Sequence, residues 1–173
     1  MKRCVKSEVV SLMLELLTGV PDRTMESAKL LIQMAPSDLD PRFLSRVLGD
    51  QSYKEWSRVG AAYILGFIPI TPSTEHQYVL RNVLAEKRFG TRLRSHAAEA
   101  LGNLKDQASG SILKARLFDS GESTSVRKWC IYALSELASA ESNRALEVFA
   151  RSQPKGVLAS ELHACFGHTA LQG

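Results

Sequence analysis

Histidine and cysteine are the residue types best suited to metal binding or nucleophilic chemistry, and three of them lie close together near the end of this sequence: His163, Cys165 and His168. A spacing of five residues on a helix places two side chains about 140° apart, so the two histidines would not converge on one ion. The other cysteines, Cys4 and Cys130, have no close partner. We therefore predict no metal site, no disulfide and a reducing, cytoplasmic location.

The sequence lacks the short motifs that mark common catalytic sites. It contains no Walker phosphate-binding loop, no dinucleotide-binding glycine pattern, no nucleophile elbow and no Cys-x-x-Cys pair. Only the nearby basic residues Lys2, Arg3 and Lys6 could activate the thiol of Cys4. These observations predict no catalytic residue, no cofactor and no enzymatic activity.

Aspartate and arginine recur at a fixed spacing. Asp50 precedes Arg58 by eight residues, and Asp119 precedes Arg127 by eight, whereas Arg94 has no such aspartate. An aspartate in the turn before a helix can accept hydrogen bonds from the first amides of that helix and pair with the arginine. We interpret these five residues as a structural ladder that joins successive turns. A row of arginines that binds phosphates is the alternative interpretation.

An internal repeat predicts the helices that position these residues. Three segments beginning with arginine align at offsets of 36 and 33 residues, at 58–68, 94–104 and 127–137. Their third, fourth, seventh and tenth positions after the arginine are mostly small or apolar, and these positions fall on one side of a helix. The segments before them repeat leucines at the same offsets: Leu44 and Leu48, Leu80 and Leu84, Leu113 and Leu117.

Each repeat is therefore predicted to consist of a first helix, a turn and a second helix. One such pair cannot bury its apolar stripe alone, so neighbouring pairs must stack into a continuous core. We predict an all-α protein of about five antiparallel helix pairs in one domain, 1–173. The approximate repeats are 1–35, 36–70, 71–104, 105–138 and 139–173, with a marked break at 68–73 and a poorly matching last repeat.

Composition is compatible with such a domain. The chain has 173 residues, of which 45% are hydrophobic and 23% charged, so it is neither disordered nor unusually polar. Its net charge of +4 permits nucleic-acid or acidic partners without requiring them. Glu8 and Glu15 interrupt the first apolar stretch, which indicates an amphipathic helix and not a signal peptide. No apolar run is long enough to span a membrane.

The repeats resemble the HEAT family, in particular the short bacterial HEAT-like and phycobilin-lyase-type repeats. The resemblance rests on Val126-Arg127, on the run from Ala97 to Gly102, and on Asp119 with its downstream arginine. It implies a right-handed, armadillo-like superhelix, or α-solenoid, in which the second helices of the pairs line the concave side. Most relatives are binding scaffolds with unrelated partners, so the resemblance is specific for the fold and not for the function.

The second helices present one further strip opposite their buried stripe, and it mixes aromatic and polar residues. Such a strip suits protein binding, because large rings bury area at low entropic cost, whereas Glu26, Glu99 and Glu136 would repel phosphate. Packing of Trp129 and Tyr132 against neighbouring repeats is the alternative. The candidate partner-binding residues are Lys29, Gln33, Tyr63, Phe67, His96, Glu99, Asn103, Trp129, Tyr132 and Glu136.

Glycine recurs within the second helices, at Gly66 and Gly102. A glycine inside a helix costs about 1 kcal/mol relative to alanine, so its presence needs a reason. Close approach of two helices is the interpretation we favour, and room for a ligand is the alternative.

These features predict a non-catalytic protein–protein interaction module, that is, a scaffold, adaptor or inhibitor that binds another protein along its second helices. Two alternatives remain: a nucleic-acid-binding protein similar to the HEAT-like glycosylases, and, from the family resemblance alone, a subunit similar to chromophore lyases. We expect a monomer or weak oligomer that does not associate with membranes.

Overall fold

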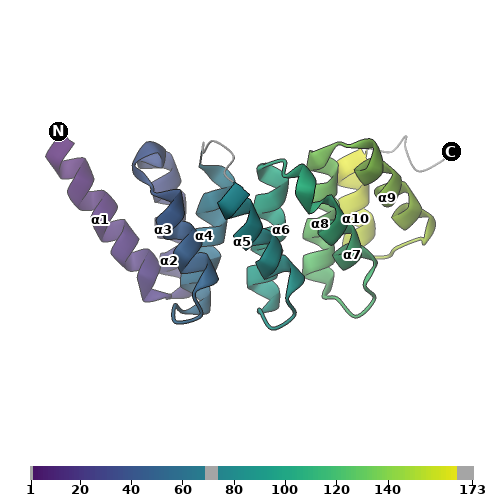
Figure 1. Ribbon diagram of the computed structural model, residues 1–173, viewed down its shortest axis with the longest axis horizontal. Helices are drawn as coiled ribbons and strands as arrows, with labels where there is room; N and C mark the ends of the chain where they lie inside the picture. The colour runs from purple at the N-terminus through teal and green to yellow at the C-terminus, as the bar shows by residue number, and fades with distance from the viewer. Residues whose placement is uncertain (1, 69–73, 167–173) are drawn as a thin grey trace. The chain divides into compact units, whose positions relative to one another are not determined.

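The computed structural model describes residues 2–68 and 74–166, and within these ranges the chain folds into helices without any β-strand (Figure 1). The all-α prediction is confirmed. Two short 3-10 helices, Pro36–Asp38 and Gln107–Ser109, precede α3 and α7. The α-helices are α1 (Lys2–Thr18), α2 (Pro21–Met34), α3 (Pro41–Gly49), α4 (Glu55–Phe67), α5 (Thr74–Ala85), α6 (Thr91–Asn103), α7 (Gly110–Phe118), α8 (Thr124–Leu137), α9 (Ala140–Arg151) and α10 (Val157–Phe166).

The chain divides into two compact units, Met1–Leu80 and Arg81–Gly173, with the boundary inside α5. In the first unit α1 packs on α2, α3 packs on α4, and α2 and α4 also contact each other. In the second unit α8 contacts α7, its partner in the pair, and the second helices α6 and α10 of the neighbouring pairs. Each unit is therefore a stack of helix pairs, as predicted. The single domain and the handedness of a superhelix stay predictions.

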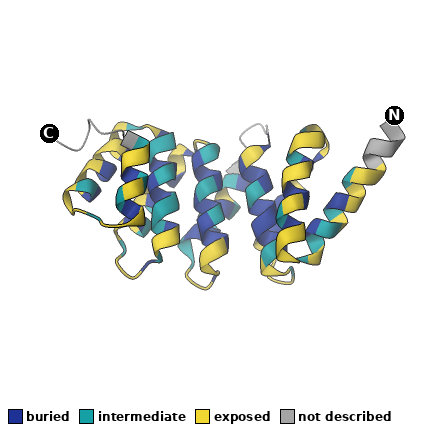
Figure 2. Cartoon of the chain, turned by 180° about the vertical axis from the view of Figure 1, so that it is seen from behind, coloured by how far each residue is buried: buried dark blue, intermediate teal, exposed yellow. Residues whose placement is uncertain are grey.

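The leucine rows that define the repeat are buried. Leu44, Leu48, Leu84, Leu113 and Leu117, all on the first helices of the pairs, have no exposed surface. Figure 2, drawn from behind, shows buried and exposed residues side by side on the second helices. Full burial of one leucine side chain contributes about 1.5–3 kcal/mol. The repeated apolar positions are thus the core of each stack.

Short polar side chains start several of the helices. The carboxylate of Asp40 accepts a hydrogen bond from the Arg42 amide at 2.9 Å, directly before Pro41 begins α3. The hydroxyl of Ser123 accepts from the Val126 amide at 3.2 Å at the start of α8. These caps satisfy amides that have no partner within their own helix. The predicted break at 68–73 lies largely outside the described residues.

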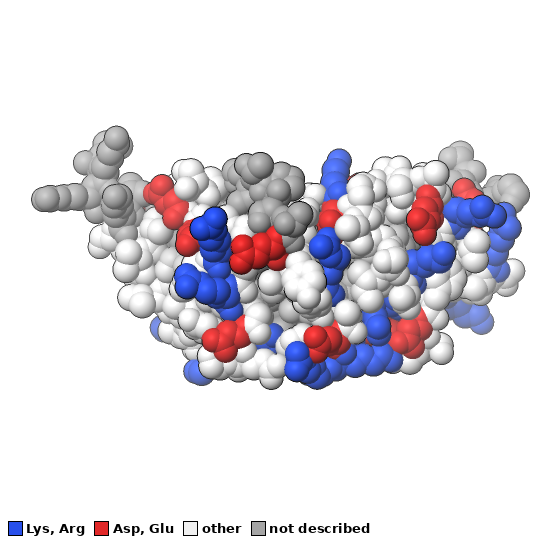
Figure 3. Space-filling view, in the orientation of Figure 1, with Lys and Arg blue, Asp and Glu red and all other residues white. Residues whose placement is uncertain are grey.

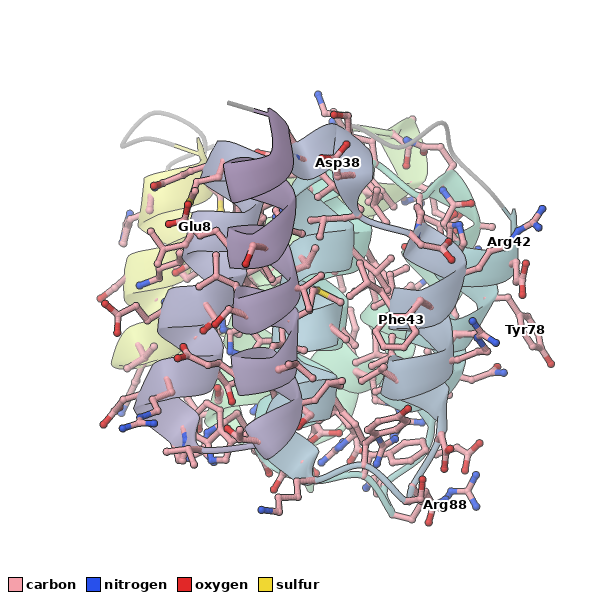
Figure 4. The ribbon with its side chains drawn as sticks, turned by 90° about the vertical axis from the view of Figure 1, so that its left-hand side faces the viewer. Glu8, Asp38, Arg42, Phe43, Tyr78 and Arg88 are labelled. Atoms are coloured by element: carbon pink, nitrogen blue, oxygen red, sulfur yellow. The ribbon has the colours of Figure 1, made fainter. Side chains whose placement is uncertain are left out.

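Exposed side chains carry both signs of charge. On the face drawn in Figure 3, both basic and acidic side chains are present, scattered among uncharged residues. In the first unit Arg42 and Tyr78 point away from the helices, and Tyr78 is 59% exposed (Figure 4). None of the helices in the described ranges combines the length and the apolar character that a membrane crossing requires.

Ala138 ends α8 in the left-handed backbone conformation, with φ 48° and ψ 24°. This conformation costs an alanine roughly 1 kcal/mol that a glycine does not lose. We therefore expect Ala138→Gly to raise the free energy of unfolding by about 1 kcal/mol in urea denaturation. Ala115→Gly, at an exposed position inside α7, is the control and should lower it by a similar amount. If both variants changed the free energy of unfolding in the same direction, the left-handed conformation of Ala138 would not be the cause.

Candidate functional site

The arginines that open the second helices bind backbone carbonyl groups. The Nε atoms of Arg58 and Arg127 donate to a carbonyl oxygen near the end of the first helix of the same pair, and so tie the two helices together. The Nε of Arg94 donates to a carbonyl oxygen in the turn between α5 and α6. The bonds run from Arg58 to Leu48 (2.8 Å), from Arg94 to Phe89 (3.0 Å) and from Arg127 to Leu117 (2.9 Å).

The aspartates of the predicted ladder close their own turns. Asp50 accepts from the Ser52 amide at 2.8 Å, and this hydrogen bond is the main reason that the pKa of Asp50 is lowered. Asp119 accepts from the Gly121 amide at 2.9 Å and pairs with Lys87 at 2.7 Å, and the Lys87 contact is the largest cause of its lowered pKa. Asp119 thus joins two successive turns, but through a lysine that the sequence analysis did not single out.

Glu122 is a second residue that the sequence analysis missed. Its carboxylate pairs with the guanidinium of Arg94, and both side chains are buried. Glu122 also accepts from the Ser123 amide at 2.7 Å, at the start of α8. One signal was available: Arg94 lacks an aspartate eight residues earlier, so it needed another anion if the arginines play one role.

Predicted partner-binding residues do come together on α6 and α8 of the second unit. The Tyr132 hydroxyl donates to Oδ1 of Asn103 at 2.7 Å, across the two helices. The rings of Trp129 and Tyr132 meet edge to face, with centroids 5.5 Å apart. Nδ1 of His96 lies 2.8 Å from Oε2 of Glu99. All five side chains remain partly exposed.

Helix α10 adds residues that the sequence analysis did not include. Oε2 of Glu161 lies 3.6 Å from Nζ of Lys128, and the same ammonium lies 5.0 Å from the centroid of the Trp129 ring. Lys128 and Glu161 occupy the same repeat position at the offset of 33 residues, which was the available signal. We define the aromatic–acidic face as His96, Glu99, Asn103, Lys128, Trp129, Tyr132, Glu136 and Glu161.

The remaining candidates belong to the first unit. The rings of Tyr63 and Phe67 on α4 have centroids 4.7 Å apart, and Phe67 is 45% exposed. Lys29 and Gln33 on α2 are exposed. These four residues form a smaller set on α2 and α4 of the first unit.

The histidine–cysteine cluster near the end of the sequence is described only in part. His163 is exposed on α10 and Cys165 is half-buried, whereas His168 lies outside the described residues. Within 2–68 and 74–166, histidine, cysteine and acidic residues nowhere gather in a group of three or more that could hold a metal ion.

The phenol of Tyr132 should titrate above its ordinary pKa near 10. Burial raises this pKa most, and the carboxylates of Glu136 and Glu99 raise it further. Ionisation of this phenol costs more in the folded state than in the unfolded state, so the free energy of unfolding should fall as the pH rises above about 10. We expect Glu136→Gln to lower the phenol pKa in an ultraviolet absorbance titration, with Tyr132→Phe identifying the transition. An unchanged titration in Glu136→Gln would show that the carboxylate does not act on the phenol.

The fold defines the class of protein, an all-helical protein built from stacked helix pairs. Residues 93–119 match the family model of the PBS lyase HEAT-like repeat, which confirms the predicted resemblance. A search of the curated proteins gave no match. Among solved structures, the chain is similar to human deoxyhypusine hydroxylase in complex with glycerol, with a TM-score of 0.61 and 24% sequence identity over 75% of this chain. The chain spans 43% of the length of that enzyme chain.

The prediction that this chain is not an enzyme is corrected by that comparison. Human deoxyhypusine hydroxylase is an enzyme and has a similar fold. A helical stack of this kind is therefore compatible with catalysis.

Proposed function

We propose that this chain is a protein-binding HEAT-like module whose second unit contacts its partner through the aromatic–acidic face. The observation that supports the proposal is the Trp129–Tyr132 pair, which is partly exposed and oriented by the hydrogen bond from Tyr132 to Asn103. Oriented aromatic rings lose little side-chain entropy on binding and bury a large area, which is typical of interface hot spots.

The position of the two rings favours binding over a purely structural role. Helix α8 has a neighbour on each side, α6 and α10, and its apolar residues Ile131 and Leu134 are fully packed. Trp129 and Tyr132 keep exposed surface although these neighbours are present. A ring that served only the core would be expected to lose that surface, as the leucines of the same helices do.

Charge disfavours a nucleic-acid partner on this face. Three carboxylates, those of Glu99, Glu136 and Glu161, would lie against the phosphates and repel them. Lys128 already pairs with Glu161 and is not available for phosphate neutralisation. A protein partner therefore fits the face better than a nucleic acid does.

Site-specific photo-cross-linking tests the proposal. A photoreactive amino acid in place of Trp129 should give a discrete cross-linked protein in cells that produce the chain. The same amino acid in place of Tyr78, exposed on the first unit, is the control. A cross-linked product that forms at position 129 and is lost when the Tyr132→Ala substitution is added would support binding of the partner by the aromatic–acidic face. Identical products from both positions, or none from Trp129, would overturn the proposal.

A further inference from the structure

Carboxylates from three helices act electrostatically on the phenol of Tyr132. Glu99 lies on α6, Glu136 on α8 and Glu161 on α10, and each of them disfavours ionisation of the phenol. The side chains of Glu99 and Glu161 are only 12% and 17% exposed. Charges that are shielded from water interact more strongly with an incoming charge. The face therefore has a negative potential where its aromatic rings lie.

The three carboxylates differ in their partners. Glu161 pairs with Lys128, and Glu99 contacts His96. Glu136 forms no ion pair with any basic side chain in the part of the chain that the structure describes. Glu136 also lies four residues after Tyr132 on α8, which places the two side chains on one side of the helix.

Lys128 shows how this face holds a positive charge. Its ammonium lies over the Trp129 ring and beside the Glu161 carboxylate, so one ring and one carboxylate together hold one cation. Tyr132 and Glu136 offer the same two groups a turn further along α8, where the described residues supply no ion-pair partner for Glu136. Lys128 of the chain itself thus occupies the first cation position, beside Trp129 and Glu161, and the second position lies beside Tyr132 and Glu136.

We propose that the second position receives a lysine or arginine side chain of a partner protein, seated against Tyr132 and between Glu99 and Glu136. This inference rests on the proposed function of the aromatic–acidic face. An apolar partner is disfavoured, because covering Glu136 without a counter-charge would bury an uncompensated carboxylate. A polypeptide is favoured over a free cation, because the partly exposed Trp129 and Tyr132 rings beside the site offer apolar area that a side chain and its neighbours can cover.

Random dodecapeptides displayed on phage and selected on the full chain are the probe. We expect the selected peptides to be enriched in lysine or arginine. For the best peptide, measured by fluorescence anisotropy, Glu136→Gln should weaken binding about tenfold, and added salt should weaken binding to the wild-type chain. Glu147→Gln, which alters an exposed glutamate of α9, is the matched control and should leave the affinity unchanged.

A second variant separates recognition from mere structural support. Lys128→Gln removes the internal cation and frees Glu161, so it should strengthen binding of the basic peptide about threefold by making the face more negative. Loss of folded structure in the variant could not produce such a gain. Unchanged or weaker binding would contradict the role assigned to Lys128.

The outcomes distinguish this inference from the proposed function. Peptides whose binding depends on Trp129 but not on Glu136, or that lack lysine and arginine, would overturn the cation site and leave protein binding by this face intact. Peptides that bind equally well to wild type, Trp129→Ala and Glu136→Gln would overturn both. Failure to enrich any peptide would also count against both.

Discussion

Replacement of Glu122 by alanine is expected to lower the free energy of unfolding by about 3–5 kcal/mol, because it leaves a buried guanidinium without its counter-charge. The side chains of Arg94 and Glu122 are 7% and 1% exposed, so water cannot take the place of the carboxylate. The Arg94 Nε would still donate to the Phe89 carbonyl, but the charge that faces Glu122 would have lost its main partner. Urea denaturation followed by circular dichroism measures the loss.

Two variants control for the buried charge. The double variant Arg94→Met with Glu122→Leu removes both charges and should recover most of the lost stability. Glu86→Ala breaks the Arg88–Glu86 pair, whose side chains are 61% and 42% exposed, and should change stability by less than about 1 kcal/mol. If Glu122→Ala were as mild as Glu86→Ala, the buried pair would not hold the repeat together.

The second large effect is expected at Gly102, where α6 and α8 lie close together. A Cβ at this position would lie 2.7 Å from the Ala133 Cα and 3.0 Å from its Cβ. The obstacle is main chain and cannot rotate away, so the two helices must separate. We expect Gly102→Ala to cost about 1–3 kcal/mol of unfolding free energy, although alanine favours a helix by about 1 kcal/mol over glycine.

Larger side chains should have larger effects and should also reach the aromatic–acidic face. The nearest ring atom, Cε1 of Tyr132, would lie 3.4 Å from the new Cβ, so Gly102→Leu would displace the ring that the proposed partner contacts. Gly110→Ala is the control, because its Cβ would meet only Leu137 at 3.8 Å, an ordinary contact. If the Gly102→Ala variant were more stable than wild type in the same urea assay, the close approach of the two helices would be refuted.

The buried rows of the fold could be predicted from the sequence because helical periodicity is a local property. Leu44, Leu48, Leu113 and Leu117 repeat at offsets that only stacked helix pairs explain, and they are fully buried. Close approach at Gly102 also followed from local reasoning, since a glycine inside a helix is unfavourable unless something requires it. Tyr132 and Asn103 were assigned to one face by the same periodicity.

Which groups contact each other was decided by tertiary structure. The sequence placed Arg58, Arg94 and Arg127 at the start of their helices, but only the packing of each pair shows that their Nε atoms donate to main-chain carbonyls. Glu122 and Glu161 became partners of Arg94 and Lys128 because stacking brings side chains from different repeats within contact distance. The one-dimensional pattern specifies which side of a helix a residue occupies. The sequence could have singled out Glu122 and Glu161 as candidates, but their partners across the stack depend on how closely the helices pack and on the turns between them, which a local pattern does not specify.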